Sequence, residues 1–168
     1  LNVLDICFGL GYNSALLFKN IKRQSSSLRW YGLEIDKRPL KYALSNESFK
    51  ALWDKKTIDI LNSLLISGFF KDENHNCDLL WEDARKGILK IPQDINFDVI
   101  FLDGFSPQKC PEIWSAEFLS QVIGKLNSEG SLLTYSSSAA VRKTFLDLKL
   151  RIFNICLLYT SPSPRDGL

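Results

Sequence analysis

The sequence has a single histidine, His75, and its four cysteines form no Cys-x-x-Cys pair. Zinc sites and disulfide frameworks need several such residues at short spacings, so we expect neither, and a reducing cytoplasm fits the chain better. No apolar run approaches the roughly 18 residues that a membrane span needs. The first residues lack the basic start and the small-residue cleavage site of a signal peptide. These absences predict a cytoplasmic protein that holds no metal.

Both ends of the chain are expected to be incomplete. Leu1 is not an initiator methionine, and it opens directly on a strand-like segment. Residues 156–168 resemble one translated frame of a sequencing adapter, and their two Ser-Pro pairs could not continue a strand inside a sheet. We therefore expect one incomplete domain over residues 1–155 and a non-native tail over residues 156–168.

The composition indicates one α/β domain. At 168 residues, with 45% hydrophobic and 24% charged residues, the chain can form a sizeable core. Apolar strand-like segments alternate with helical ones, which predicts a mostly parallel sheet with helices on both faces. The expected strands are residues 2–8, 28–35, 77–81, 97–103 and 131–135, with another beginning at 151. The expected helices are residues 14–20, a segment from Pro39, much of 49–70, 115–126 and 139–148, with Asn13 or Ser14 capping the first and a turn at 127–130.

The end of the first expected strand carries a glycine-rich turn. Ligands of open α/β sheets bind beyond the carboxyl ends of the strands. Here the run Asp5-Ile-Cys-Phe-Gly-Leu-Gly-Tyr-Asn13 places two glycines where a tight turn would let a ligand approach the backbone closely. A dinucleotide enzyme is a rival interpretation, although Ser14 only approximates the third small residue of Gly-x-Gly-x-x-Gly.

Acidic residues follow the next two expected strands. Glu34 closes the second strand, where an acid can accept hydrogen bonds from both hydroxyls of a ribose. Asp83 and Ala84 follow the third, where an acid beside a small residue can accept from an adenine amino group. The alternative for Asp83 is a helix N-cap, and the alternative for Glu34 is a solvated side chain.

Asp103 follows the clearest buried strand of the sequence. The next eleven positions, up to Trp114, form a loop that contains glycine, prolines and aromatic residues. We interpret this segment as a catalytic platform, and the alternative is a buried carboxylate that caps the loop. Phe105 and Trp114 are candidates to stack on a base, although either could instead belong to the core.

In this order, the glycine turn, ribose acid, Asp-Ala pair and strand-end acid resemble the Rossmann-like class I S-adenosylmethionine-dependent methyltransferases. Residues 101–114 resemble the Phe-Leu-Asp-Gly-Phe-x-Pro-x-Lys-x-Pro-x-x-Trp motif of the tRNA 5-methylaminomethyl-2-thiouridine methyltransferase family. Residues 8–13, 34–40 and 130–142 are similar to its glycine turn, its acid-Lys-x-Pro-Leu segment and its last strand with the following Val-Arg helix. The resemblance covers residues 1 to about 155, and Cys7 stands where the family usually has glycine.

The resemblance implies methyl transfer from S-adenosylmethionine to the amine of 5-aminomethyl-2-thiouridine at the tRNA wobble position. Asp103 would orient the amine and stabilise the positive charge that grows on nitrogen, and either Asp103 or water would take the proton. Glu34 is favoured for the ribose, although the spacing of the family segment fits Asp36 better. The candidate cofactor-binding residues are Asp5, Phe8, Gly9, Gly11, Asn13, Glu34, Asp36, Asp83 and Ala84. The candidate substrate-binding residues are Gly104, Phe105, Pro107, Lys109 and Trp114.

Two other functions share part of this pattern. Aminopropyltransferases of the spermidine synthase type have the same fold, ribose acid and Asp-Ala pair, but the Gly-Phe-Ser-Pro loop argues against them. A non-catalytic RNA-binding relative would keep the fold, but the intact glycine turn and acids argue against it. Basic clusters near residues 19–23, 37–41 and 55–56 are either solvated helix faces or a phosphate-contacting patch. The sequence leaves open whether a flavin-dependent oxidase domain follows.

Overall fold

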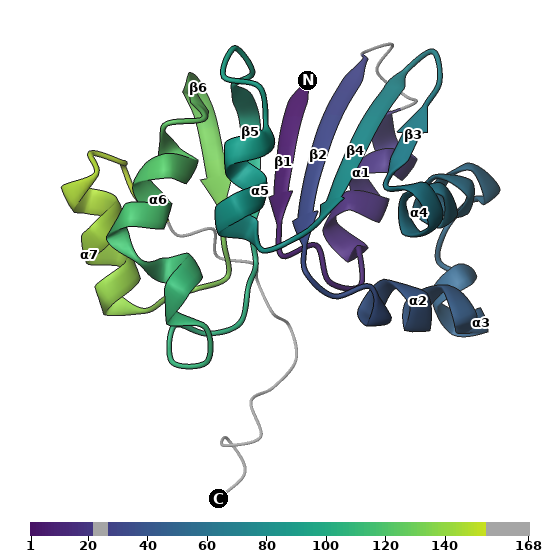
Figure 1. Cartoon of the computed structure of the whole chain (residues 1–168), viewed down its shortest axis with the longest axis horizontal. Coiled ribbons are helices and arrows are strands. Elements are labelled where there is room, and N and C mark those ends of the chain that lie inside the picture. Colours follow the sequence, from purple (N-terminus) through teal and green to yellow (C-terminus); the bar gives the residue numbers. More distant parts are fainter. Residues whose placement is uncertain (22–26, 154–168) are drawn as a thin grey trace, which may run out of the picture.

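A computed structural model describes residues 1–21 and 27–153 of the chain, and its centre is a six-stranded sheet with the order β3-β4-β2-β1-β5-β6 (Figure 1). Only β3 runs antiparallel to its neighbour, so the expected mostly parallel α/β fold is confirmed. The strands are β1 Asn2–Ile6, β2 Leu28–Glu34, β3 Phe69–Lys71, β4 His75–Trp81, β5 Phe97–Leu102 and β6 Leu126–Leu133. The helices are α1 Tyr12–Ile21, α2 Arg38–Ser45, α3 Glu47–Lys50, α4 Lys55–Ser67, α5 Ala84–Lys90, α6 Ala116–Ile123 and α7 Ala139–Asp147, and a 3₁₀ turn, η1, spans Pro111–Trp114.

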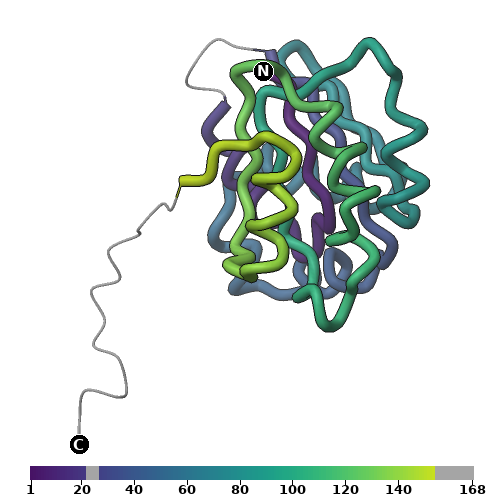
Figure 2. Tube along the Cα trace, turned by 90° about the vertical axis from the view of Figure 1, so that its left-hand side faces the viewer, coloured from purple at the N-terminus to yellow at the C-terminus, as the bar shows by residue number. Residues whose placement is uncertain are grey.

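Helices cover both faces of the sheet. Helices α1 to α4 lie on one face and α5 to α7 on the other, and Figure 2 views the molecule from the side of α6 and α7. Successive strand residues point to opposite faces. In β1, Val3 accordingly packs into the core beneath α1 to α4, whereas Leu4 packs into the core beneath α5 to α7. Both side chains are almost fully buried, which is why apolar residues stand next to one another in this strand.

Helix α4 and the strand after it were only partly predicted. Asp54 caps the helix by accepting a hydrogen bond from the Thr57 N–H at 2.8 Å. The helix ends at Gly68, whose φ of 74° lies in the left-handed region that glycine adopts readily. The short strand β3 follows immediately and pairs antiparallel with β4 at the sheet edge. Its first two residues, Phe69 and Phe70, end the segment that the sequence predicted as mostly helical, so no strand was predicted there.

Three other expectations were wrong. Helix α1 begins at Tyr12, so Asn13 and Ser14 lie in its first turn and do not cap it. The predicted turn at 127–130 lies within β6, which pairs with β5 through an irregular register between Phe97 and Val99. Residues 151–153 form no strand. The rest of that expected strand, 154–155, and the adapter-like tail at 156–168 lie outside the described residues.

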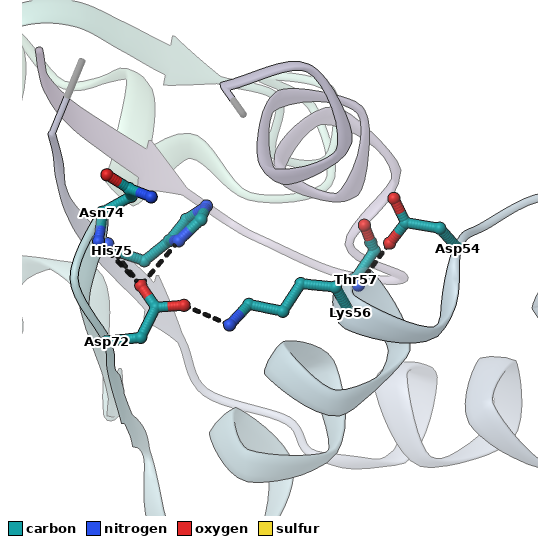
Figure 3. A network of polar contacts seen from close by, with 6 residues as sticks. All are labelled: Asp54, Lys56, Thr57, Asp72, Asn74 and His75. Atoms are coloured by element: carbon teal, nitrogen blue, oxygen red, sulfur yellow. Dashed lines mark hydrogen bonds and ion pairs between the residues drawn. The ribbon is translucent and has the colours of Figure 1, made fainter. Parts of the chain in front are cut away.

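A polar network joins α4 to the β3–β4 hairpin (Figure 3). The Asp72 carboxylate pairs with Lys56 and with Nδ1 of His75, the latter at 2.9 Å, and accepts from the Asn74 and His75 N–H groups at 3.0 and 2.7 Å. Burial by itself would raise the pKa of Asp72. The hydrogen bonds from Lys56, His75 and the backbone outweigh burial and hold that pKa well below its usual range.

Replacing Asp72 by Asn is expected to lower the free energy of unfolding at pH 7 by about 1–3 kcal/mol, because Lys56, Asn74 and His75 lose a charged acceptor. Since the folded-state pKa is depressed, this contribution is fully present above the unfolded carboxyl pKa of about 4, begins to decrease as the pH falls below that value, and is lost as the pH falls through the lower folded-state pKa. Urea denaturation at pH 7 and at pH 3.5 measures the difference, and Glu73→Gln, at the exposed neighbouring residue, is the matched control. Equal stability of Asp72→Asn and the parent at pH 7 would contradict the prediction.

Candidate functional site

The predicted site residues gather where β1 lies between β2 and β5. The chain order runs outward from β1 in both directions, through β2 and β4 on one side and β5 and β6 on the other. This reversal of strand order is the point at which open α/β sheets bind ligands. The glycine turn after β1, Glu34 at the end of β2 and Asp103 after β5 all belong to this edge.

The glycine turn is a left-handed loop held against β2. Cys7, Gly9 and Gly11 have positive φ values of 65°, 57° and 84°. The Cys7 N–H donates to the Leu33 carbonyl at 2.9 Å, which fixes the start of the turn. A Cβ on Gly11 would lie 2.6 Å from the Phe8 ring, so this position needs glycine for space as well as for φ. Cys7 takes the left-handed conformation despite its side chain, so the turn keeps its path without glycine there.

Glu34 faces the glycine turn. One carboxylate oxygen accepts from the Gly9 N–H at 2.8 Å, and the other accepts from the Asp36 N–H at 2.9 Å. A carboxylate can accept about four hydrogen bonds, so each oxygen can still receive one from a ribose hydroxyl. Asp36 instead pairs with Arg38 at 2.7 Å, and hydrogen bonds from Arg38 hold the pKa of Asp36 below its usual range. The geometry therefore favours Glu34 as the ribose acid.

Asp5 lies beneath the site with 2% of its surface exposed. It accepts a hydrogen bond from the Ser14 hydroxyl, which in turn accepts from Trp30 Nε1 at 2.8 Å. Burial raises the pKa of Asp5 to about 7; the Ser14 hydrogen bond opposes this shift, and the charges of Asp103 and Glu34 add to it. Asp5 is thus a buried carboxyl group whose hydrogen bond with Ser14 ties β1 to α1.

Asp83 has the geometry of a helix cap. Its carboxylate accepts from the Arg85 N–H at 2.9 Å, at the start of α5, and pairs with the Arg85 guanidinium at 2.6 Å. These bonds hold the pKa of Asp83 below its usual range. The neighbouring Ala84 is buried. Asp83 is therefore the N-cap of α5, which is the alternative role that the sequence suggested. A contact between Asp83 and adenine stays a prediction.

The Asp103 carboxylate is held from two sides. Asn13 Nδ2 donates to one oxygen at 2.6 Å, and the Tyr135 N–H donates to the other at 3.2 Å. The Tyr135 hydroxyl donates to the Gly104 carbonyl. Gly104 is buried, and a Cβ there would lie 2.0 Å from Ile113 Cδ1, so the backbone beside Asp103 is closely packed.

The two aromatic residues of the Asp103 loop have different environments. Phe105 is 73% exposed, whereas Trp114 is 6% exposed and packs in the core beneath α5 to α7. Trp114 Nε1 donates to the Phe105 carbonyl at 2.7 Å, so the tryptophan supports the loop from inside. The buried ring of Trp114 has no free face for a base, so only Phe105 of these two residues stays a candidate to stack on one. Pro107 is half-buried and Lys109 is exposed on the same loop.

Tyr135 was not among the predicted site residues. It lies just beyond β6, is 62% exposed, and contacts both Asp103 and Gly104 through hydrogen bonds. The carboxyl ends of parallel strands share one edge, so Tyr135, the last residue of the fifth predicted strand, could have been included on that ground alone.

Two absences hold for residues 1–21 and 27–153. In this part of the chain, no group of three or more His, Cys, Asp or Glu side chains is placed to hold a metal ion. Over the same residues, no helix is both long and apolar enough to cross a membrane.

Residues 47–154 match the model of a family described as S-adenosyl-L-methionine-dependent methyltransferase, and the chain belongs to this family. Its cofactor is accordingly S-adenosylmethionine. The chain is 33% identical, over 84% of its own length and 21% of the relative's, to the tRNA 5-methylaminomethyl-2-thiouridine biosynthesis bifunctional protein MnmC of Campylobacter hominis. It is 29% identical to an uncharacterized protein of Methanocaldococcus jannaschii, over 86% of the chain and 40% of that protein.

A solved structure supports the same relationship. The crystal structure of MnmC2 from Aquifex aeolicus superimposes with a TM-score of 0.70 and 28% identity, covering 88% of this chain and 46% of that one. The chain therefore spans less than half the length of each of these three relatives.

Proposed function

We propose that this methyltransferase acts on the amine of a 5-aminomethyl-2-thiouridine at the wobble position of tRNA. The observation that carries the proposal is the placement of two carboxylates, Glu34 at the end of β2 and Asp103 after β5, on either side of the glycine turn that follows β1. Both reactants of such a transfer carry positive charge, on the sulfonium of the donor and on the alkylammonium of the acceptor. The resemblance of residues 101–114 to the family motif, and the names of the MnmC relatives, support this substrate class.

The residues present fit the cofactor. Glu34 has acceptor capacity left for the ribose hydroxyls, and Gly9 and Gly11 let a ligand approach the backbone of the turn. The exposed Ile35, directly after Glu34, offers an apolar surface next to the ribose acid. Phe8 is buried and supports Gly11 from below. Asp83 and Ala84 would lie on the adenine side, as the strand order predicts.

S-adenosylmethionine supplies a methyl group on a positively charged sulfur. The nitrogen lone pair of the acceptor would form the new N–C bond as the bond to sulfur breaks and its electron pair stays on sulfur, and Asp103 or water would take the one proton that the nitrogen loses. An alkylammonium with a pKa of about 10 has no free lone pair, so it must lose a proton before it attacks, and exclusion of water from the amine by the bound base would favour this neutral form. Asp103 would then orient the amine and stabilise the charge that develops on nitrogen.

Phe105→Ala is expected to raise the KM for tRNA about tenfold, because one base loses its aromatic stacking partner. The dissociation constant of S-adenosylmethionine should stay within about twofold, because Phe105 belongs to the loop after β5 and not to the glycine turn. Steady-state methylation at varied tRNA concentration measures the first quantity, and calorimetry measures the second. Phe105→Tyr keeps the ring and is the matched control. Equal KM values for the Ala and Tyr variants would exclude stacking at this residue.

The test of the function is radiolabelled methyl transfer to two tRNAs. One carries 5-aminomethyl-2-thiouridine, and the other carries 2-thiouridine without the aminomethyl group. We expect transfer to the first only. Cofactor binding by calorimetry without transfer to either tRNA would overturn the substrate, and no cofactor binding would favour the non-catalytic relative. Turnover with decarboxylated S-adenosylmethionine and a polyamine acceptor would favour the aminopropyltransferase.

A further inference from the structure

We propose that Asn13, which the sequence predicts as a cofactor contact, is a positioning residue that orients the Asp103 carboxylate for methyl transfer. The inference rests on the proposed function, because it assigns Asp103 to the acceptor amine. It is carried by one hydrogen bond, from Asn13 Nδ2 to Asp103 at 2.6 Å, between residues 90 positions apart in the sequence. This contact joins the helix after the glycine turn to the loop that carries the catalytic carboxylate.

The backbone that presents Asn13 is fixed on both sides. The Ala15 N–H donates to the Gly11 carbonyl at 2.8 Å and begins the hydrogen bonding of α1. In addition, the residue directly after Asn13, Ser14, is fully buried and forms hydrogen bonds with both Asp5 and Trp30. Asn13 is itself exposed, so it is this fixed backbone that presents its amide to Asp103.

Asn13 holds one half of a carboxylate whose other half is held elsewhere. The Tyr135 N–H donates to the second oxygen of Asp103 at 3.2 Å, from the segment after β6. Two donors on two oxygens set the plane of the carboxylate, and each oxygen can still accept another hydrogen bond. The Asn13 amide is therefore engaged with Asp103, and its N–H groups are less available to the cofactor than the sequence predicted.

The arrangement also links the two halves of the site. Glu34 holds Gly9 of the turn, and Asn13 follows Gly11 by two residues in the same loop-to-helix segment. A cofactor that orders the turn would thereby order Asn13 and the carboxylate bonded to it. Asn13 contributes to the reaction through Asp103 and need not touch either reactant.

Asn13→Ala is expected to lower kcat for tRNA methylation about tenfold and to leave the dissociation constant of S-adenosylmethionine within about twofold. Asn13→Asp should lower kcat further, because it places a second negative charge next to Asp103. Asn20→Ala is the matched control, since Asn20 lies on the same helix and its side chain bonds only to the Leu16 carbonyl among the contacts described. A tenfold weaker cofactor affinity with unchanged kcat in Asn13→Ala would overturn the proposal and restore the cofactor contact.

A double-mutant cycle separates positioning from a merely structural role. If Asn13 acts through Asp103, Asn13→Ala should cost about tenfold in the parent and almost nothing in an Asp103→Asn background. Multiplicative losses in the two variants would overturn the proposal.

The same four proteins should also show non-additive stabilities in urea, a readout that needs no RNA. If the stabilities are coupled and the cofactor binds but no tRNA is methylated, the proposed substrate fails, and with it the role of Asn13 in that reaction. If tRNA is methylated and the kinetic losses multiply, only the inference about Asn13 fails.

Discussion

Replacing Asp103 by Asn is expected to lower the turnover of tRNA methylation by roughly a hundredfold or more, about 2.7 kcal/mol upward in activation free energy. Asn keeps the size of the side chain and removes its charge. The carboxylate follows a buried strand, is held by Asn13 and Tyr135, and belongs to a loop that contains Pro107 and Pro111. A charge fixed in advance stabilises the cation that develops on nitrogen without reorganising during the reaction.

The measurement is radiolabelled methyl transfer at saturating tRNA and cofactor. The affinity for S-adenosylmethionine should change much less than turnover, because the expected ribose and adenine contacts belong to other strands. Asp94→Asn, at an exposed acid before β5, is the matched control and should be indistinguishable from the parent. Near-normal turnover of Asp103→Asn would remove this residue from catalysis.

The second large effect is expected at Glu34. Glu34→Ala should weaken S-adenosylmethionine binding by about 1.5–3 kcal/mol, the contribution of hydrogen bonds to a charged group. The variant removes the ribose acceptor and also the partner of the Gly9 N–H, which shapes the turn. Calorimetric titration measures the affinity, and circular dichroism checks that the variant is folded.

Asp36→Ala separates the two acids of this segment. Asp36 pairs with an exposed arginine, and exposed ion pairs contribute little, so cofactor affinity should change by less than about twofold. The reverse pattern, weak binding in Asp36→Ala and normal binding in Glu34→Ala, would move the ribose contact to Asp36. Glu34→Gln, which keeps an acceptor for the Gly9 N–H, should lie between the parent and Glu34→Ala.

The central strands of the fold could be predicted because their residues are buried on both faces. Val3 and Leu4 are both in the core although they point to opposite helix layers, and with Ile6 these apolar neighbours make β1 easy to recognise as a buried strand. The position of the site followed from the same assignment, since strand ends in a parallel sheet lie at one edge. Asp103 and Glu34 could therefore be predicted as site residues from the sequence alone.

The remaining features depend on distant contacts. Trp114 and Tyr135 are both aromatic residues near turns, and only tertiary packing determines that the first is buried and the second exposed. The hydrogen bond between Asn13 and Asp103 connects α1, which follows β1, to the loop after β5, the neighbour of β1 in the sheet, and it has no local sequence pattern. Strand β6 contains Asn127 and Gly130, which are typical of turns. Asn127 is held in the sheet by its hydrogen bond to Asp98 at 2.6 Å.

The left-handed Cys7 has a consequence for the chemical selectivity of the enzyme. A thiolate is a strong nucleophile, and a cysteine in the turn assigned to a methyl donor would compete with the amine as an acceptor. Burial raises the pKa of Cys7 to about 12, and the negative charge of Glu34 adds to the shift. At pH 7 only on the order of one thiol in 10⁵ would then be ionised. Because the Cys7 thiol stays protonated, we expect that the enzyme does not methylate its own cysteine.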